Sequence, residues 1–187
     1  MSAILEIPEV RRRVSRLSVE QYHRLDEFNE RGCRTELIRG IVIEKMSKSP
    51  LHSSIAKRLY DRIVRMLPNG WVVRREDPLT LDDSEPEPDI AVVRGTENQF
   101  FEAHPTTADL VVEVAVSSAT LDRENASLYA EAGVPEYWIV LGVERKVEVY
   151  RQPKGGHYQE KFTLESTDWL QCESVASVKV LISDLFA

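Results

Sequence analysis

One stretch, DLVVEVAV at residues 109–116, constrains the fold of this 187-residue chain more than any other. Its apolar residues follow one another instead of alternating with polar ones, which is typical of a buried strand near the centre of a sheet. Glu113 interrupts the run. A carboxylate in such a strand costs several kcal/mol unless it is paired with a cation or bound to a metal. The stretch therefore predicts a central strand that carries an acid in need of a partner.

The rest of the chain divides into short strands and amphipathic helices. Ser18 and Gly32 bound a first helix, and the apolar stripe of Ile55, Leu59 and Ile63 predicts a second helix over 51–67. We further expect a hairpin or bulged strand pair at 35–46, a helix at 122–133, a last strand or short helix in the C-terminal tail, and strands at 71–76, 89–93, 109–116, 136–142, 146–152 and 157–165. This order predicts a mixed α/β (α+β) fold, with a largely antiparallel sheet flanked by helices.

Length and composition indicate one domain, which we place at residues 17–187 behind a flexible N-terminal arm, residues 1–16. No apolar run approaches the roughly 20 residues that a membrane helix needs, and the N-terminal segment does not resemble a signal peptide. Cys33 and Cys172 form neither a disulfide framework nor a metal-ligand spacing. We therefore expect reduced thiols in a cytoplasmic protein that has no membrane partner.

The charge is unevenly distributed along the chain. The net charge is −7, and residues 76–102 contain nine Asp or Glu against a single basic residue, Arg94. Such a segment repels phosphate unless a cation neutralises it. A bound divalent metal would do so, although a solvated acidic loop is the simpler interpretation. The outer face of the 51–67 helix is basic, because it carries Lys57, Arg58, Arg62 and Arg65. This face is either solvated or in contact with phosphates.

Three acids stand where buried strands normally exclude them. Asp89 opens the strand at 89–93, Glu113 lies inside the central strand, and Glu36 opens the early hairpin. If the strands at 89–93 and 109–116 are neighbours, Asp89 and Glu113 face one another, and two such carboxylates repel unless a cation lies between them. Mg²⁺ suits this donor set because it prefers oxygen ligands. The alternatives are an edge strand or an arginine partner for Glu113, and a plain turn position for Asp89.

Several segments resemble a known protein family. They are TELIRGIVIEKM, the His52 that opens the next helix, EPDIAVV, DLVVEVAVSS, DRENASLYAEAGVPEYWIV and KVEVYR. They are similar to the bacterial family described as "putative restriction endonucleases", within the PD-(D/E)XK nuclease-like superfamily. The resemblance covers about residues 17–185, and EPDIAVV and AGVPEYWIV are its most specific segments. It implies a restriction-endonuclease-like fold.

The resemblance also implies roles for individual residues. Asp89, in Pro88-Asp89, matches the metal-binding aspartate of the family, and Glu113 matches the second metal-binding acid. The backbone carbonyl of Val114 would contact the same ion, Mg²⁺ or Mn²⁺. Glu36 matches an acid of the early hairpin that approaches this site. A homodimer that acts on DNA is a further implication.

Two positions depart from the family pattern. In the wider superfamily a lysine stands two residues after the second acid, where this chain has Ala115. In the family the lysine usually lies on the next helix, four residues before the tyrosine of LYA, where this chain has Asn125. Asparagine can orient an attacking water but carries no charge to stabilise the transition state. Arg123 is two residues away on the helix and points elsewhere, and the sequence identifies no substitute.

The combined prediction is a Mg²⁺-dependent endonuclease that hydrolyses DNA phosphodiester bonds. Its catalytic residues would be Glu36, Asp89, Glu113 and Asn125. Because Asn125 replaces a lysine, the alternative is a weakened or inactive nuclease-fold homodimer that only binds DNA or a protein. A third interpretation is a structural or regulatory protein that never contacts nucleic acid.

Two further expectations concern residues outside this acidic set. His52 opens a helix after SKSP, so we expect it to cap that helix or to lie at the surface. Tyr137 and Trp138 are neighbours in a strand, so we expect them to alternate between core and surface rather than to stack on bases.

Overall fold

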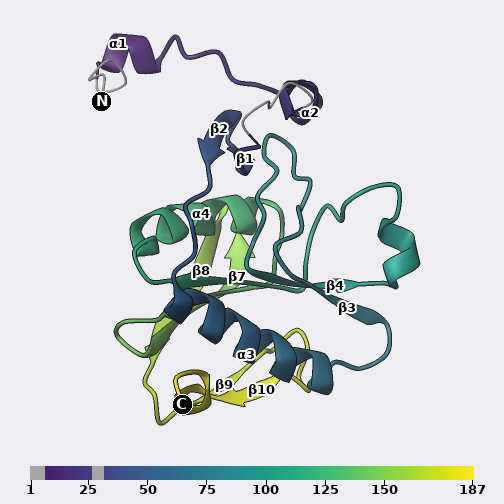
Figure 1. Cartoon of the computed structure of the whole chain (residues 1–187), viewed down its shortest axis with the longest axis vertical. Helices are drawn as coiled ribbons and strands as arrows, with labels where there is room; N and C mark the ends of the chain where they lie inside the picture. Colours follow the sequence, from purple (N-terminus) through teal and green to yellow (C-terminus); the bar gives the residue numbers. More distant parts are fainter. Residues whose placement is uncertain (1–6, 27–31) are drawn as a thin grey trace. The chain divides into compact units, whose positions relative to one another are not determined.

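The predicted central strand is β5, Leu110–Ala115, in a six-stranded sheet. Figure 1 labels β3, β4, β7 and β8 of this sheet. The order of strands across this sheet is β3-β4-β5-β6-β7-β8. β5 and β6 run parallel, and every other neighbouring pair in the sheet is antiparallel. The largely antiparallel sheet is therefore confirmed. The other strands are β3 Trp71–Arg74, β4 Ile90–Arg94, β6 Glu136–Leu141, β7 Lys146–Lys154 and β8 His157–Leu164.

This computed structural model describes residues 7–26 and 32–187, and the chain divides into two compact units. The smaller unit contains Met1–Lys45 and Asp82–Glu85, and the larger contains Met46–Leu81 and Pro86–Ala187. The six-stranded sheet belongs entirely to the larger unit. The interpretation of residues 17–187 as one domain stays a prediction. Both cysteines are free thiols.

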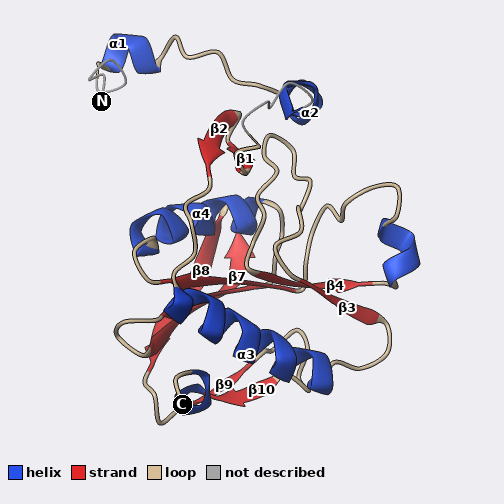
Figure 2. Cartoon of the chain, in the orientation of Figure 1, coloured by secondary structure: helices blue, strands red, loops and turns tan. Residues whose placement is uncertain are grey.

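Helices cover both faces of the sheet in the larger unit, as Figure 2 shows. Helix α3, Pro50–Met66, packs on one face, together with a C-terminal segment that contains β9 Trp169–Gln171, β10 Lys179–Leu181 and η3 Ile182–Leu185. Helix α4, Ala119–Glu131, packs on the other face and connects the parallel strands β5 and β6. No helix within residues 7–26 and 32–187 is long and apolar enough to cross a membrane.

The sequence sets both ends of α3. Ser49 is the N-cap residue, and its hydroxyl oxygen accepts a hydrogen bond from the backbone N–H of His52. Pro50 follows at the first helical position, where its missing N–H has no consequence. The helix ends before Leu67, whose extended conformation suits the residue that precedes Pro68. The predicted apolar stripe is buried against the sheet.

Because both faces of the sheet are covered, one expectation from the sequence is wrong. Tyr137 and Trp138 do not alternate between core and surface, because both side chains are fully buried. Trp138 belongs to the apolar cluster on the α3 face, and Tyr137 to the cluster on the α4 face. β6 is an inner strand that has packed side chains on either side. Alternation along a strand gives one exposed face only where a face is left uncovered.

In the smaller unit, α1 is a single turn at Pro8–Arg11, and α2 spans Val19–Asp26. Ser18 caps α2 through a capping box: its hydroxyl accepts the Gln21 N–H, and the Gln21 side chain accepts the Ser18 N–H. The predicted start of this helix is thus confirmed. Residues 1–6 of the predicted arm, and residues 27–31 before the predicted helix end at Gly32, lie outside the described residues.

The predicted hairpin is present in the same unit. Strands β1, Thr35–Ile38, and β2, Ile41–Glu44, pair antiparallel, with Ile38 opposite Ile41. The two-residue turn between them, Arg39-Gly40, has positive φ at both positions, as tight hairpins require. A Cβ on Gly40 would lie 2.6 Å from the Cβ of Arg16. Only glycine therefore fits this turn without a backbone shift.

Candidate active site

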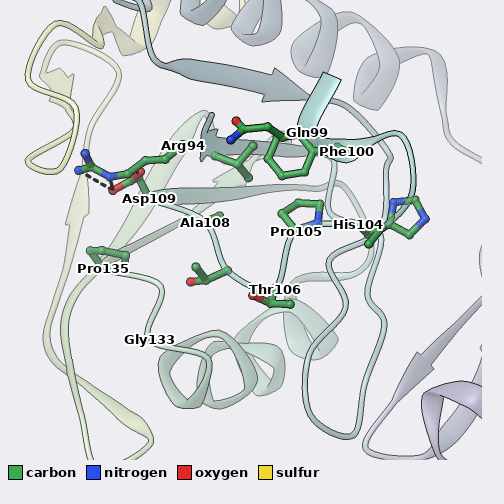
Figure 3. Close-up of a pocket in the computed structure, with 13 residues that line it drawn as sticks. Arg94, Gln99, Phe100, His104, Pro105, Thr106, Ala108, Asp109, Gly133 and Pro135 are labelled. Atoms are coloured by element: carbon green, nitrogen blue, oxygen red, sulfur yellow. Dashed lines mark hydrogen bonds and ion pairs between the residues drawn. The ribbon is translucent and has the colours of Figure 1, made fainter. Parts of the chain in front are cut away.

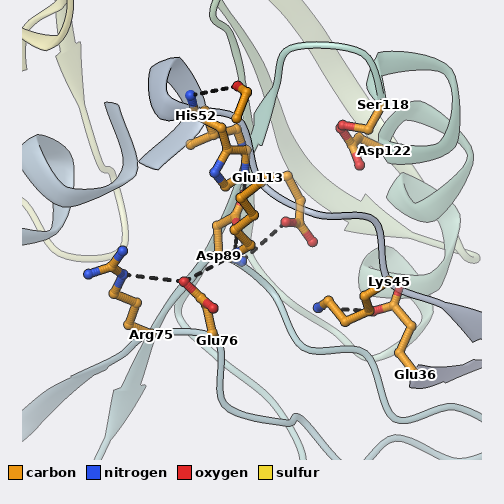
Figure 4. Close-up of polar contacts among 12 residues, drawn as sticks. Glu36, Lys45, His52, Arg75, Glu76, Asp89, Glu113, Ser118 and Asp122 are labelled. Atoms are coloured by element: carbon orange, nitrogen blue, oxygen red, sulfur yellow. Dashed lines mark hydrogen bonds and ion pairs between the residues drawn. The ribbon is translucent and has the colours of Figure 1, made fainter. Parts of the chain in front are cut away.

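Asp89 and Glu113 meet at one end of the β4–β5 pair, in the larger unit (Figure 4). Ile90 pairs with Val112, so the register places Asp89 opposite Glu113. The Asp89 backbone N–H donates a hydrogen bond to Glu113 Oε2 at 3.1 Å. The two acids therefore come together from adjoining strands, as the sequence predicted.

The Asp89 carboxylate accepts three hydrogen bonds. Lys48 Nζ lies 2.6 Å from Oδ1, while His52 Nε2, at 2.9 Å, and the Val114 backbone N–H, at 2.8 Å, both bind Oδ2. Burial alone would raise the pKa of Asp89, but the hydrogen bonds and charges of His52 and Lys48 outweigh it and lower the pKa to about 2. Asp89 is consequently ionised at neutral pH although its side chain is 8 % exposed.

The contacts of His52 and Lys48 with Asp89 were not expected from the sequence, which predicted His52 only as a capping or surface residue. His52 neither lies at the surface nor caps its helix with its ring; the ring contacts Asp89 from the first turn of α3. Because the carboxylate is an acceptor, His52 Nε2 carries the proton in this contact. The buried Nδ1 atom has no hydrogen-bond partner among the described residues. Lys48 lies in the segment before the Ser49 cap, and no local pattern connects it with an acid 41 residues later.

Lys48 connects Asp89 to a further acid. Lys48 Nζ lies 3.1 Å from Glu76 Oε1, and this Glu76 oxygen also lies 3.6 Å from Arg75 Nε. Figure 4 shows Arg75, Glu76 and Asp89 along this chain of charges. The Lys48 side chain is only 22 % exposed. A single ammonium is thus held between two carboxylates beside the candidate site.

Glu113 extends from β5 toward the α4 face of the sheet. Val112 and Val114, on either side of it in the chain, belong to the apolar cluster on the opposite face. The hydroxyl of Tyr129, from α4, donates a hydrogen bond to Glu113 Oε1 at 3.1 Å. Since β5 is an inner strand of the sheet, the alternative that Glu113 lies on an edge strand is wrong.

Asn125 lies on the buried side of α4, four residues before Tyr129. Residues four apart share one helix face, so Asn125 lies one turn away from the tyrosine that contacts Glu113. Asp122 is also buried on α4, and its carboxylate accepts a hydrogen bond from the Ser118 hydroxyl at 2.7 Å. The predicted role of Asn125 in orienting water stays a prediction.

Glu36 and Val114 were predicted as members of the same site. Glu36 lies in β1 of the smaller unit, where its Oε2 is 3.5 Å from Lys45 Nζ. Its approach to Asp89 stays a prediction. Val114 contacts Asp89 through its N–H, whereas the predicted metal contact is through its carbonyl oxygen, which also stays a prediction.

The donor set is compatible with a hard divalent cation. A carboxylate offers about four acceptor positions, and three on Asp89 are occupied, two of them on Oδ2 and one on Oδ1. One position on Asp89 Oδ1 therefore remains for a metal. Across residues 7–26 and 32–187, no three His, Cys, Asp or Glu side chains form a metal-binding cluster. Mg²⁺ needs only one or two carboxylates because it keeps several waters, so Asp89 and Glu113 fit it.

A separate cavity of about 460 Å³ opens at the opposite end of β4 and β5 (Figure 3). Arg94, the last residue of β4, and Asp109, just before β5, lie on its wall. Asp109 is already engaged, because it accepts hydrogen bonds from Arg94 and from the Trp71 indole N–H. Asp89 and Glu113 do not line this cavity. The acidic site is therefore separate from this cavity.

Comparisons with known proteins found a family model and a similar solved structure. A family model, Uma2, described as "Putative restriction endonuclease", matches residues 19–182. A crystal structure of "a putative nuclease belonging to DUF820" from Anabaena variabilis ATCC 29413 superposes with a TM-score of 0.77 at 24 % sequence identity, over 91 % of this chain and 97 % of that chain. No curated protein matches the sequence. The structural likeness shows a shared fold, and together with the family model it confirms the restriction-endonuclease-like prediction.

Proposed function

The chain belongs to the Uma2 family of "putative restriction endonucleases", and from this membership we propose that it is a metal-dependent endonuclease that hydrolyses DNA phosphodiester bonds. The observation that carries the proposal is the pairing of Asp89 with Glu113. Two acids meet at the end of adjoining strands, and one of them is kept ionised in a nearly buried position. A nuclease needs a divalent ion at its reacting phosphate, in addition to the Lys48 ammonium that already contacts Asp89.

In the proposed site Asp89 and Glu113 hold Mg²⁺ or Mn²⁺, and the Val114 carbonyl is a further ligand. Such an ion polarises the phosphodiester and makes a bound water more acidic. His52 and the Val114 N–H fix the orientation of the Asp89 carboxylate, and the Tyr129 hydroxyl fixes that of Glu113. Fixed ligands matter because small errors in geometry reduce the rate steeply.

The reaction is an ordinary hydrolysis. The oxygen of water forms a bond to phosphorus, the bond from phosphorus to the leaving ester oxygen breaks, and the leaving oxygen receives a proton. Asn125 would orient the attacking water through its side-chain amide. Glu36 is proposed as an additional acid of the site.

Plasmid nicking tests the proposal. Wild type is incubated with supercoiled DNA and Mg²⁺ or Mn²⁺, beside Asp89→Asn and a matched Asp109→Asn control. Asp109 also adjoins β5 and is also partly buried, but it lies at the far end of the sheet. Wild type and the control should nick the plasmid, while Asp89→Asn should be slower by a factor of about 100 or more. Equal nicking by wild type and Asp89→Asn, or none by wild type with either metal, would refute the proposal.

The second candidate is a nuclease-fold protein that binds DNA or a protein without cutting. Asn125 favours it, because a lysine expected by resemblance is absent from that position. Asn125→Lys separates the two candidates. Cleavage that appears only in this variant identifies a degenerate site, whereas cleavage by wild type excludes the binding-only alternative.

The homodimer that the family resemblance implies is part of the proposal as well. Sedimentation velocity over a range of protein concentrations tests it. A single species with twice the monomer mass supports the dimer, and a monomer at all concentrations contradicts it.

A further inference from the structure

We infer that Lys48 is a further catalytic residue, whose ammonium supplies the positive charge beside the reacting phosphate that Asn125 cannot supply. This inference rests on the proposed function. It assigns a role to a residue on the loop before α3 that neither sequence pattern nor family resemblance identified.

The Lys48 ammonium lies directly beside the candidate metal ligand, Asp89. Lys48 Nζ hydrogen-bonds Asp89 Oδ1 at 2.6 Å, and Oδ1 is the oxygen with an unused acceptor position. Asp89 Oδ2 already has two donors. An ion bound to Asp89 would therefore share Oδ1 with Lys48. Groups that share one ligand atom are close enough for both to contact the same phosphate.

Lys48 has more N–H donors than it has carboxylate partners among the described residues. An ammonium has three N–H groups. Within the described residues, Lys48 faces two carboxylates, Asp89 at 2.6 Å and Glu76 at 3.1 Å. One N–H then remains for a phosphate oxygen. Glu76 and Asp89 hold the ammonium from two directions, so the third direction is fixed before substrate arrives, and preorganised donors stabilise developing charge most effectively.

The segment that carries Lys48 is held at the capped start of α3. Ser49, the next residue, caps α3 through the His52 N–H, and the His52 ring in turn contacts Asp89. Lys48 and His52 thus reach the same carboxylate from one capped helix start. A lysine on a mobile surface loop would lose more side-chain entropy in forming such a contact.

The charge at this end of the sheet also favours a cation beside the phosphate. Asp89, Glu113 and Glu76 bring three carboxylates to this end of the sheet, and a phosphodiester approaching them is repelled. Lys48 offsets part of this charge at the point of contact. Loss of one such stabilising group slows a reaction by a factor of about 10²–10³.

A purely structural role, as counter-ion to Asp89 and Glu76, is the competing interpretation. Lys48→Met distinguishes the two when rate and metal affinity are measured together. Single-turnover cleavage is followed at saturating Mn²⁺, and Mn²⁺ affinity is measured without DNA from the loss of the free-ion electron paramagnetic resonance signal. Thermal melting confirms that the variant folds, and Lys48→Gln is the substitute if it does not.

We expect Lys48→Met to lower the cleavage rate and to raise the affinity for Mn²⁺. The rate should fall about 100-fold, while Mn²⁺ should bind on the order of tenfold more tightly, because a positive charge near the ion has been removed. Lys161→Met is the control, since Lys161 forms an ion pair with Glu148 at 3.4 Å on β8, the edge strand three places from β5 in the sheet. Both readouts should stay at the wild-type level in this control.

The possible results separate this inference from the proposed function. If wild type does not cleave at all, the proposed function fails. If wild type cleaves and Lys48→Met cleaves within threefold of its rate, or binds Mn²⁺ no more tightly, only the assignment of Lys48 is overturned. In the double variant Lys48→Met/Asn125→Lys, recovery of at least tenfold in rate supports the role of the charge, and a rate no higher than that of Lys48→Met contradicts it.

Discussion

Glu136 is the acid whose removal should damage the fold most. It opens β6, and its side chain is fully buried. Its Oε1 accepts hydrogen bonds from the Trp138 indole N–H at 2.7 Å and from the Arg151 guanidinium at 2.9 and 3.0 Å, while Oε2 accepts the Glu173 backbone N–H at 2.7 Å. All these donors would lose their acceptor in Glu136→Ala.

The expected loss in the free energy of unfolding is about 3–5 kcal/mol. Each buried donor left unpaired costs about 1–3 kcal/mol, and breaking a buried ion pair by removing one partner costs about 3–5 kcal/mol. The two estimates describe the same groups and are not added. Arg151 keeps its contacts to the Glu173 carboxylate and the Gln171 carbonyl, which limits the loss.

Urea denaturation followed by circular dichroism measures this difference. Glu173→Ala is the matched control, because Glu173 binds the same arginine at 2.8 Å but has a 62 % exposed side chain. Exposed ion pairs contribute about 0–1 kcal/mol. If Glu136→Ala is destabilised by less than 1 kcal/mol, or by no more than Glu173→Ala, the reasoning about buried partners is wrong.

Three further predictions concern other parts of the molecule. Burial would raise the pKa of Glu148, but hydrogen bonds from Arg123 and from a tyrosine, with a lysine charge nearby, lower it to about 2. The ionised Glu148 carboxylate therefore stabilises the fold fully above about pH 4.5, and this stabilisation is lost as the pH falls toward 2. Between pH 5 and pH 2, wild type should lose about 2 kcal/mol more unfolding free energy than Glu148→Gln in urea titrations, and parallel losses would contradict this. Tyr129→Phe removes the hydroxyl that binds Glu113, so Mn²⁺ affinity should fall about tenfold, and an unchanged affinity would show that the hydroxyl does not position the ligand. Gly40→Ala should lower the melting temperature by several degrees, with a loss of about 1–3 kcal/mol, because of its positive φ and the contact with the Arg16 side chain; an unaltered melt would contradict the assigned turn geometry.

The sequence predicted those features that local patterns encode. The apolar run at 109–116 identified the inner strand β5, and the position of each acid relative to its strand predicted that Asp89 and Glu113 face one another. The Ser18 cap and the hairpin turn were predicted for the same reason, since their signals lie within a few residues of each other.

Other features depend on contacts between distant segments. Lys48 and His52 reach Asp89 across 41 and 37 residues of chain, and neither has a periodicity or motif that points to a carboxylate. Tyr137 and Trp138 were assigned to alternating environments because a single strand does not reveal that both faces of its sheet are covered. These contacts and burials depend on how the helices and the sheet pack together, and not on the local propensity of each segment.

Binding of a divalent ion at Asp89 is the most direct test of the central claim. Mn²⁺ is titrated into wild type, Asp89→Asn and Asp109→Asn without DNA, and the free ion is measured by electron paramagnetic resonance. We predict one site per chain in wild type and in Asp109→Asn, with affinity at least about tenfold weaker in Asp89→Asn. Identical binding curves for wild type and Asp89→Asn would contradict the account.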